Sequence, residues 1–372
     1  MERYEIENIA IAMWVAKLSG AERKVYINFL QSVSNPIELI NNQDFFNEIK
    51  NNSLNKDVIN SNCELLNQWF KLGIKCVALG CQDYPIKLST IEDPPLILFY
   101  MGDISNVVGE SRSTLAVIGS RRADLDMCKV AYDFSNQACA CGLCIVSGLA
   151  YGVDASAHRG ALATQQTGAT VAVLGGGLKH IYPRVHIPLA KEIVDNGGAV
   201  ISQFLPDESP FPVNFLNRNR VIAGLSDAVL VIQASERSGS LSTARFALED
   251  GRDVLVCPGA YNDSRFAGSN QLIKQGAFLV SDINDVFDFF PEIQEECRGK
   301  IGDIIEDSKI VLVNKFEKKV WKLLSNGGLD REDLIMKLLE EFGQDSNIQT
   351  HLLEMELSGK ILILPGDRIV RG

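Results

Sequence analysis

The residue types with the clearest chemical meaning in this chain are two adjacent arginines, Arg121 and Arg122, which follow Gly119 and Ser120 at the end of an apolar run. Where a strand turns into a helix, unpaired backbone N–H groups form a site for an anion. The Ser120 hydroxyl is a further donor, and guanidinium groups bind phosphate through paired hydrogen bonds. The segment therefore predicts a phosphate site. It matches neither the GxxxxGK[ST] loop nor the GxGxxG turn, and the alternative is a pair of solvated arginines.

A second candidate site combines an aromatic ring with arginines, since Phe215 precedes Arg218 and Arg220. Rings stack on unpaired bases and guanidinium groups bind the neighbouring phosphates, so this combination is typical of proteins that bind single-stranded nucleic acid. On a helix of about 3.6 residues per turn, residues two apart point about 200° apart. Both arginines then cannot face one ligand, which leaves one of them for a structural ion pair. The alternative for Phe215 is a plain core position.

Three further segments are weaker candidates for binding an anion. Lys179 follows three successive glycines, which allow a ligand to approach closely, and its ammonium could reach a phosphate. Ser238, Gly239 and Ser240 form a small-residue turn that enters a helix, and Ser269 begins another helix in the same way. These serines are candidates for a secondary anion site. The alternative is that they only cap the two helices.

Asp154 and His158 are the candidates for catalysis, because residues four apart share one face of a helix. A catalytic pair of this kind needs a nucleophile, and the sequence offers no Ser or Cys in an identifiable elbow. We therefore interpret Asp154 as the N-cap of a helix and His158 as a residue that supports the preceding loop.

Nine cysteines at irregular spacings indicate reduced thiols rather than a disulfide framework. Cys128, Cys139, Cys141 and Cys144 cluster in sequence, but they fall on a helix, at its end and at the start of a strand. Zinc sites more often use paired Cys-x2–4-Cys knuckles, so we expect small buried side chains and no metal.

The N-terminus carries acids before its apolar stretch, unlike a signal peptide, and no apolar run is long enough to cross a membrane. The sequence predicts a cytoplasmic protein.

The elements that must position these residues alternate between strands and helices. Apolar runs typical of buried strands occur at residues 114–118, 143–147, 170–174, 199–202, 228–232 and 253–257. Apolar strands separated by helices indicate parallel strands that are covered on both faces. The sequence thus predicts an α/β fold with a doubly wound, mostly parallel sheet, whose ligand sites lie at the C-terminal ends of the strands.

The flanking segments have different patterns, which predict four parts in the chain. Residues 1–72 indicate an N-terminal helical (SAM-like) domain, and residues 73–292 form the α/β core. Residues 293–308 are an acidic linker. Residues 309–372 contain three helical segments and a β-hairpin, the pattern of a winged-helix domain.

The net charge of −11 does not exclude a nucleic-acid site, because the acidic residues are unevenly distributed. Residues 281–308 hold 9 acidic and 2 basic side chains, whereas residues 111–280 hold 15 basic and 14 acidic ones. A local basic cluster in the middle of the chain therefore remains compatible with the low pI. A broad, histone-like basic surface is excluded.

Taken together, six segments resemble the bacterial DNA-processing protein A family (DprA, also called Smf). They lie in order within residues 73–280 and read GIKCVALGCQDYPIKLSTIEDPPLILFYMGD, VIGSRRA, VSGLAYGVDASAH, VAVLGGGLKHIYP, FLNRNRVIAGLSDAVLVIQASERSGSLSTARFALEDGRDVLVCPG and GSNQLI. The resemblance implies an extended Rossmann-like core that binds single-stranded DNA, forms a homodimer and delivers the strand to the RecA recombinase. These activities serve natural transformation (competence) or DNA recombination. No cofactor, catalysis or membrane is implied.

The resemblance also implies which residues bind DNA. The family's glycine-Ser/Thr-Arg pocket falls on Gly119, Ser120 and Arg121, with Arg122 beside it, and its aromatic residue falls on Phe215, followed by Arg218 and Arg220. Many members carry a basic residue just before that aromatic residue, where this chain has Pro212, Val213 and Asn214. Lys179 is the candidate to replace this phosphate contact.

Two other functions remain as alternatives. A Rossmann-like enzyme acting on a free nucleotide would need a glutamate beside its glycine-rich phosphate loop, whereas Glu236 precedes the loop at residues 238–244 and Glu249 lies far along the next helix. A scaffold that binds only protein partners would not need the arginines or Phe215. The sequence therefore favours a non-enzymatic protein that binds and protects single-stranded DNA.

Overall fold

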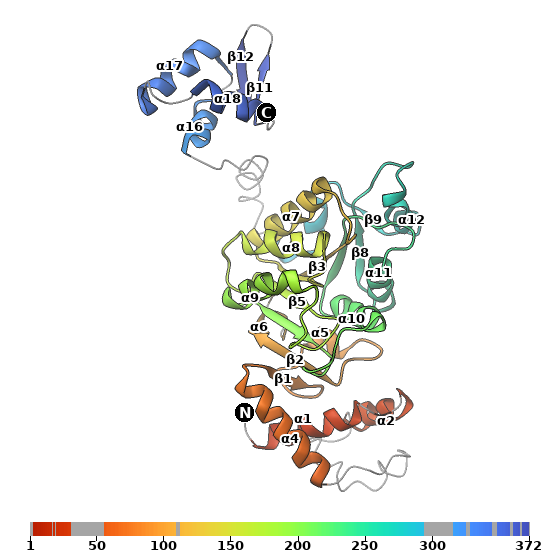
Figure 1. The fold of residues 1–372 in the computed structure, drawn as a ribbon. Coiled ribbons are helices and arrows are strands. Elements are labelled where there is room, and N and C mark those ends of the chain that lie inside the picture. The colour runs from red at the N-terminus through yellow and green to blue at the C-terminus, as the bar shows by residue number, and fades with distance from the viewer. Residues whose placement is uncertain are drawn as a thin grey trace. The chain divides into compact units, whose positions relative to one another are not determined.

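The computed structural model describes residues 3–16, 18, 20–30, 56–108, 112–293, 315–324, 328–343, 348–357, 360–364 and 367–371. The chain divides into two compact units, Met1–Lys300 and Ile301–Gly372 (Figure 1). Of the linker predicted at 293–308, residues 294–308 lie outside the described residues. None of the described helices is both long and apolar enough to cross a membrane.

A nine-stranded sheet forms the centre of the first unit, with the strand order β1-β2-β6-β5-β4-β3-β7-β8-β9. The strands are β1 (Lys75–Ala78), β2 (Ile97–Gly102), β3 (Thr114–Ile118), β4 (Cys144–Ser147), β5 (Thr170–Val173), β6 (Ala199–Ser202), β7 (Ala228–Val231), β8 (Asp253–Val256) and β9 (Phe278–Leu279). β1 pairs with β2, and β2 with β6, in antiparallel fashion, while the pairs from β6 to β9 are parallel. This confirms the predicted doubly wound, mostly parallel sheet.

Helices cover both faces of the sheet, because the side chains of its central strands are apolar on both faces. The helices between the strands are α5 (Ile86–Ser89), α6 (Ser105–Val108), α7 (Leu125–Ala140), α8 (Val153–Leu162), α9 (Ile187–Asp195), α10 (Pro212–Gly224), α11 (Ser240–Glu249) and α12 (Ala267–Lys274), and α13 (Ile283–Phe287) follows β9. Two short 3-10 turns, Arg184–His186 and Ser264–Phe266, precede α9 and α12. Asp124 caps α7, because its carboxylate accepts a hydrogen bond from the Met127 N–H at 3.0 Å.

The order of the strands determines where a ligand can bind. From β3 the chain proceeds through β4 and β5 to β6 in one direction, and from β7 through β8 to β9 in the other. In Figure 1, α7, α8 and α9 lie on one side of the sheet, and α11 and α12 lie on the other. A crevice opens at the C-terminal ends of the two strands between which the direction reverses. In this sheet those strands are β3 and β7.

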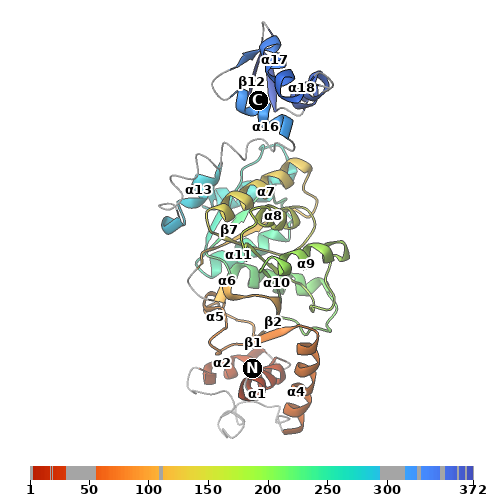
Figure 2. The same ribbon diagram turned by 90° about the vertical axis from the view of Figure 1, so that its left-hand side faces the viewer.

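The N-terminal helices α1 (Arg3–Val15), α2 (Gly20–Leu30) and α4 (Lys56–Lys71) pack on the antiparallel edge of the sheet within the first unit (Figure 2). The Trp69 ring meets the Phe99 ring of β2 edge-on at 5.5 Å. The Trp69 indole Nε1 also donates a hydrogen bond to the Asp207 carboxylate at 2.9 Å. A separate N-terminal domain that ends at residue 72 stays a prediction.

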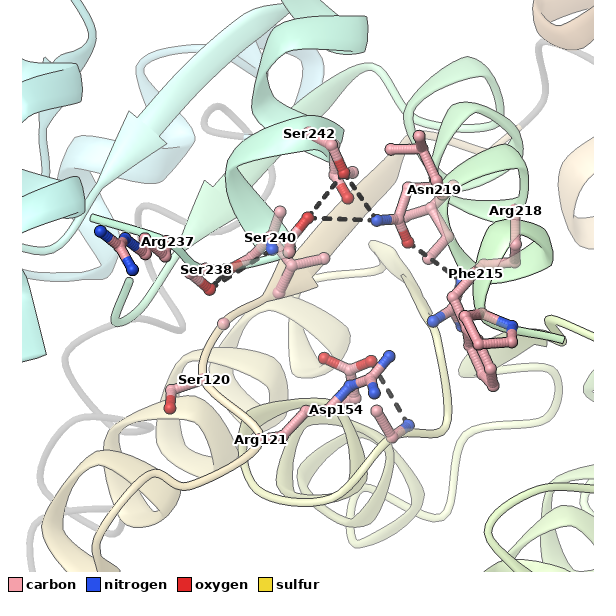
Figure 3. A pocket seen from close by; sticks show the side chains of 18 of the residues that line it. Ser120, Arg121, Asp154, Phe215, Arg218, Asn219, Arg237, Ser238, Ser240 and Ser242 are labelled. Carbon is pink, nitrogen blue, oxygen red and sulfur yellow. Dashed lines mark hydrogen bonds between the residues drawn. The ribbon is translucent and has the colours of Figure 1, made fainter. Parts of the chain in front are cut away.

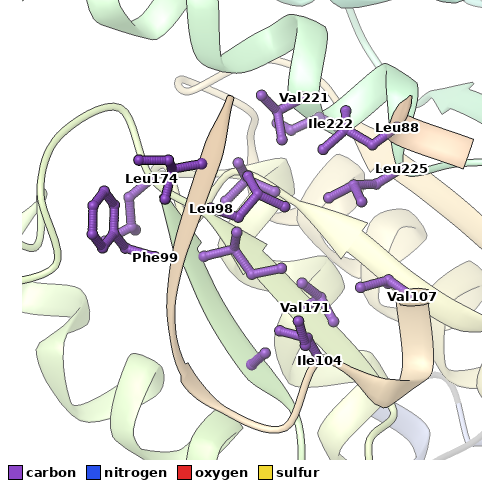
Figure 4. Close-up of a cluster of buried hydrophobic side chains, with 14 of the residues drawn as sticks. Leu88, Leu98, Phe99, Ile104, Val107, Val171, Leu174, Val221, Ile222 and Leu225 are labelled. Carbon is purple, nitrogen blue, oxygen red and sulfur yellow. The ribbon is translucent and has the colours of Figure 1, made fainter. Parts of the chain in front are cut away.

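One hydrophobic core extends from α1 into the sheet and holds α10 in place. Leu98 of β2, Val171 of β5 and Val221 of α10 are each fully buried in it (Figure 4). Leu88 of α5 belongs to the same cluster, and the Cβ that an alanine would place at Gly224 lies 2.8 Å from its methyl carbon. This packing explains how α10 keeps a fixed position above the strand ends.

The second unit has its own core and its own small sheet. Its described elements are α16 (Lys315–Leu323), β10 (Leu329–Asp330), α17 (Arg331–Phe342), α18 (Ile348–Leu357), β11 (Ile361–Leu364) and β12 (Arg368–Arg371). The sheet order is β10-β12-β11, and both pairs are antiparallel. Val320, Leu334 and Leu352 belong to its buried core. Three helices and a β-hairpin are the predicted elements, and the winged-helix assignment itself stays a prediction.

Candidate functional site

A cavity of about 850 Å³ lies at the C-terminal ends of β3 and β7, where the strand order reverses (Figure 3). We call it the strand-end cavity. It is lined by residues that follow β3, by the first turns of α10 and by the turn between β7 and α11. The lining residues that the sequence predicts to bind DNA or an anion are Gly119, Ser120, Arg121, Arg122, Phe215, Arg218, Ser238, Gly239 and Ser240.

The turn after β3 is held in one conformation by the start of α8. The Val153 N–H donates to the Ser120 carbonyl at 3.3 Å, and the Ser120 hydroxyl accepts from the Arg122 N–H at 3.1 Å. Gly152 has a φ of +71°, and a Cβ there would lie 2.3 Å from the Ser120 carbonyl oxygen. Only glycine allows this close approach. The side chains of Arg121 and Arg122 are exposed, so both guanidinium groups are accessible to a ligand.

Phe215 and Arg121 contact each other in the lining of the strand-end cavity. The Arg121 guanidinium carbon lies 5.0 Å from the centroid of the Phe215 ring, within the range of a cation–π contact. The ring of Tyr182 meets Phe215 edge-on at 5.8 Å, and Tyr182 also lines the cavity. Phe215 is partly exposed, so it is not the plain core residue that was its alternative.

Arg218 also borders the cavity, but its guanidinium group is used within the protein. It is 3% exposed, and Nη1 donates to the carbonyls of Gly148 at 2.6 Å and of Val173 at 2.7 Å. A Cβ at Gly148 would lie 2.1 Å from Nη1, so the chain passes directly against the arginine. Burial lowers the pKa of Arg218 to about 10, and Asp154 opposes this shift. The prediction that Arg218 binds a phosphate directly is therefore corrected. Its guanidinium group joins the ends of β4 and β5.

Three other predicted ligands are placed away from the strand-end cavity. Arg220 points to the other side of α10 and pairs with Asp93, which confirms that the two arginines of this helix do not face one ligand. Lys179 does not line the cavity, and its ammonium is paired with the Asp207 carboxylate. Ser269 is fully buried, and its hydroxyl accepts the Ala234 N–H at 2.8 Å. The structure therefore does not bring these three predicted ligands to the strand-end cavity.

The turn at Ser238, Gly239 and Ser240 forms the opposite wall of the same cavity, not a separate site. The two serine hydroxyls lie 2.5 Å apart. The Asn219 amide of α10 donates to the Gly239 carbonyl at 3.2 Å and to the Ser242 hydroxyl at 2.9 Å, and so connects this turn and the start of α11 to the helix that carries Phe215.

Sequence reasoning missed other residues that line the cavity, among them Tyr182, Asn219 and Arg237. A usable signal existed for Arg237, which is a basic residue beyond the end of β7. No local pattern marks Asn219, because the packing of α10 on α11 brings it to the cavity.

Asp154 and His158 do not form a catalytic pair. His158 is fully buried and does not line the cavity, and its Nδ1 lies 2.7 Å from the Thr170 hydroxyl. Asp154 lies inside the first turn of α8, whose N-cap is Gly152, so its predicted role as the cap was wrong. Its carboxylate accepts the Ala150 N–H at 3.4 Å. Burial raises the pKa of Asp154, while the nearby Arg218 opposes the shift.

The clustered cysteines lie in the core. Cys139 and Cys144 are fully buried, and the Cys139 thiol lies 3.2 Å from the Ala169 carbonyl. Burial raises the pKa of the Cys144 thiol to about 11, which keeps it protonated and disfavours metal binding. Within the part of the chain that the structure describes, no three His, Cys, Asp or Glu residues are grouped to hold a metal ion.

The buried His158 predicts a loss of stability in acid. Burial lowers its pKa from 6.5 to about 3, so between these values the unfolded chain takes up a proton that the folded chain does not. Stability should therefore fall as the pH drops below about 6.5, by up to ~1.4 kcal/mol per pH unit. Urea unfolding at pH 7 and pH 5 measures this. His158→Gln should show a smaller difference between the two pH values, and an equal difference would contradict the assignment.

Gly175, just beyond β5, leaves room for the Phe215 ring because it has no side chain. A Cβ at Gly175 would lie 2.6 Å from Cδ1 of Phe215, so Gly175→Ala must displace the ring. We expect a weaker affinity for a ligand stacked on Phe215, by up to ~1–3 kcal/mol in a binding titration. Gly239→Ala is the matched control, because a Cβ there meets nothing within 4 Å and Gly239 lines the same cavity. Equal affinities of the two variants would show that the position of the ring is unimportant.

Comparison with known proteins gives a consistent result. The family model described as DNA recombination-mediator protein A matches residues 75–291. The chain is 38% identical to Protein Smf of Escherichia coli over 288 residues, which is 76% of this chain and 74% of that protein. It is 41% identical to the DNA processing protein DprA of Streptococcus pneumoniae over 207 residues, 55% of this chain and 70% of that protein.

Two solved structures resemble the fold. The X-ray structure of DprA from Streptococcus pneumoniae has a TM-score of 0.63 and 30% identity, and the match covers 76% of this chain and 97% of that one. The structure of DprA from Helicobacter pylori has a TM-score of 0.52 and 28% identity, and it covers 59% of this chain and 96% of that one. The latter structure is described as showing a mode of single-stranded DNA binding.

Proposed function

This chain belongs to the DNA recombination-mediator protein A family, and on that premise we propose that it binds single-stranded DNA in the strand-end cavity. The observation that carries the proposal is the pair formed by Arg121 and Phe215. An accessible guanidinium group lies 5.0 Å from the centroid of a partly exposed ring, at the end of a strand where backbone N–H groups favour an anion. A phosphate and its neighbouring base fit this pair.

The remaining walls of the cavity suit a nucleic-acid backbone. Arg122 and Arg237 add positive charge, and the turn at 238–240 adds hydroxyl and backbone donors. Asp154 is the acidic residue of the described lining, and its buried carboxylate is balanced by Arg218. A site of arginines, small polar groups and one ring binds and positions a strand without an identifiable group for cleaving it, so we propose a non-enzymatic role.

The family relationship supports finer proposals. We infer that the bound strand is protected and transferred to the RecA recombinase during DNA recombination or natural transformation, and that the chain acts as a homodimer. The relatives are named for DNA processing and recombination mediation, and one is described with single-stranded DNA. Light scattering of the full chain measures whether it is a dimer. An assay of RecA nucleation on single-stranded DNA that the chain has bound measures the transfer.

The direct test of the proposed binding is a titration with labelled DNA. Fluorescence anisotropy should show tighter binding to a single-stranded oligonucleotide than to a duplex of the same length and sequence. Paired bases cannot be splayed onto the Phe215 ring, so the duplex loses the stacking contact. Equal affinity for both forms would contradict a site built on base stacking.

The second unit should be dispensable for binding the strand. Residues 309–372 carry as many acidic as basic side chains, while contacts to phosphates dominate non-specific affinity. A chain that ends at Ser308 should bind single-stranded DNA within a few-fold of the full chain in the same titration. A loss of about a hundredfold, ~2.7 kcal/mol, would place part of the site in the second unit.

A further inference from the structure

Two tyrosines at the edge of the strand-end cavity are not used by the pair of Arg121 and Phe215. Tyr182 lines the cavity, and Tyr151 directly follows Ala150, which lines it as well. Tyr182 is 50% exposed and Tyr151 is 48% exposed. Exposed apolar groups that lie together beside a cavity mark a surface for a ligand or a partner.

Ring contacts connect the two tyrosines to the proposed stacking position. The Tyr182 ring meets the Phe215 ring edge-on, with 5.8 Å between the two centroids. The Tyr151 ring lies 5.2 Å from the His186 ring, and His186 ends a short turn that follows Tyr182. Neither tyrosine is stacked parallel to its neighbour, because the rings of the two pairs are inclined by 64° and 59°. The exposed rings therefore form a path that leads out of the cavity.

The loop that presents Tyr151 is held in a strained conformation. Leu149 is fully buried and has a φ of +56°, in the region that residues other than glycine rarely adopt. Nδ1 of His186 lies 2.8 Å from the Leu149 carbonyl oxygen, and Arg218 donates to the Gly148 carbonyl at 2.6 Å. Such strain persists where the surrounding contacts enforce it, and it clusters at functional sites. The exposed position of Tyr151 is therefore built into the fold.

The surroundings of the two tyrosines suit a nucleic-acid strand. Residues 148–153 and 180–188 contain no acidic side chain, and the side chain of Arg184 is exposed. Exposed rings beside a guanidinium group can stack bases and bind a phosphate of one single strand. Val185 of the same turn is also exposed, as a surface for a protein partner would require. Continuity with the strand-end cavity favours DNA, because Tyr182 belongs to both surfaces.

We propose that Tyr182 and Tyr151 each stack a further base of single-stranded DNA and that Arg184 binds a phosphate beside them. The strand leaves the strand-end cavity over these three residues, which we call the tyrosine path. This inference rests on the proposed binding of DNA at Arg121 and Phe215, and it extends that site beyond the nucleotide that they hold. Affinity should therefore rise with the length of the strand until the tyrosine path is filled, since each stacked base adds to it.

The test is a fluorescence-anisotropy titration of the full chain with labelled oligothymidines of increasing length. Tyr151 is the residue to change, because it lies outside the lining of the strand-end cavity. Tyr151→Ala should weaken binding of the long oligonucleotides by about tenfold, or ~1.4 kcal/mol, and should bind the shortest ones as the native chain does. Tyr151→Phe keeps a ring and should bind all lengths with native affinity.

Two further variants test the surroundings of the tyrosines. Val185→Ala is the matched control, because it removes an exposed apolar side chain from the turn that carries Arg184 but removes no ring. It should bind all lengths with native affinity. Arg184→Ala should make the salt dependence shallower by about 0.7 for the long oligonucleotides, the value for one phosphate contact on a single strand.

Phe215→Ala separates the failure of this inference from the failure of the proposed function. It should weaken binding at every length, because the stacking position in the cavity is used by short and long strands alike. If Phe215→Ala binds every length with native affinity, the proposed DNA site and the tyrosine path are both overturned. If it binds more weakly while a folded Tyr151→Ala binds every length with native affinity, only the tyrosine path is overturned.

Photocrosslinking keeps the test decisive should Tyr151→Ala fail to fold. The native chain is irradiated with a long single strand that carries 5-iodouracil, a base that reacts with aromatic side chains stacked on it, and the modified peptides are identified by mass spectrometry. Crosslinks at Tyr182 and Tyr151 are the expected result. Crosslinks at Phe215 without any at the two tyrosines would overturn the tyrosine path and would leave this surface to a protein partner.

Discussion

Replacing Arg218 by methionine should destabilise the first unit by about 3–5 kcal/mol, the cost of breaking a buried charged pair by removing one partner. Methionine has a similar length, so the main loss is electrostatic. The carbonyls of Gly148 and Val173 lose their guanidinium donor, and Asp154 loses the cation that opposes its desolvation. Urea unfolding, followed by hydrogen exchange at β4 and β5, measures the effect.

Two further variants separate this explanation from a general effect of losing an arginine. Arg245→Met removes an exposed ion pair with Glu249 and should cost at most ~1 kcal/mol. Adding Asp154→Asn to Arg218→Met should recover part of the stability, because the uncompensated carboxylate is then removed. If Arg218→Met is as stable as Arg245→Met, the arginine does not join the strand ends as the structure indicates.

Truncating Phe215 to alanine should weaken single-stranded DNA binding by ~1–3 kcal/mol, the value of one stacked base. The ring is partly exposed and contacts Arg121 in the cavity lining, so its removal should leave the fold of α10 intact while removing the stacking surface. A titration with a labelled single strand measures the loss, and circular dichroism checks that the variant is folded.

A matched aromatic control shows whether the loss is specific. Tyr261 is 96% exposed and lies outside the described lining of the strand-end cavity. Tyr261→Ala should therefore bind the strand with native affinity. A folded Phe215→Ala that also binds with native affinity would show that the ring does not stack on a base.

The main features of the fold could be predicted from sequence because they depend on local patterns. Apolar runs buried on both faces marked the six central strands, β3 to β8, within a residue at each end. The order of the strands could not be read in the same way. β2 pairs with β6 in antiparallel fashion, although the paired residues are about a hundred positions apart in the chain, and no local pattern predicts that pairing.

The candidate site shows the same limit for single residues. Helical geometry alone predicted that Arg218 and Arg220 diverge, and they do. Which of them is buried depends on the ends of β4 and β5, which lie far away in sequence. Lys179 and Ser269 were assigned to ligands because their real partners, Asp207 and the Ala234 N–H, become neighbours only in the fold.

The salt dependence of binding by Arg121→Ala tests the central claim most directly. If Arg121 holds a phosphate, the slope of log affinity against log salt concentration should become shallower by about 0.7, the value for one phosphate contact on a single strand. Phe215→Ala should keep the native slope, because stacking releases no counterions. Lys179→Ala is the matched control, since that lysine is paired with Asp207 outside the cavity lining. A folded Arg121→Ala with native affinity and native slope would contradict the proposed site.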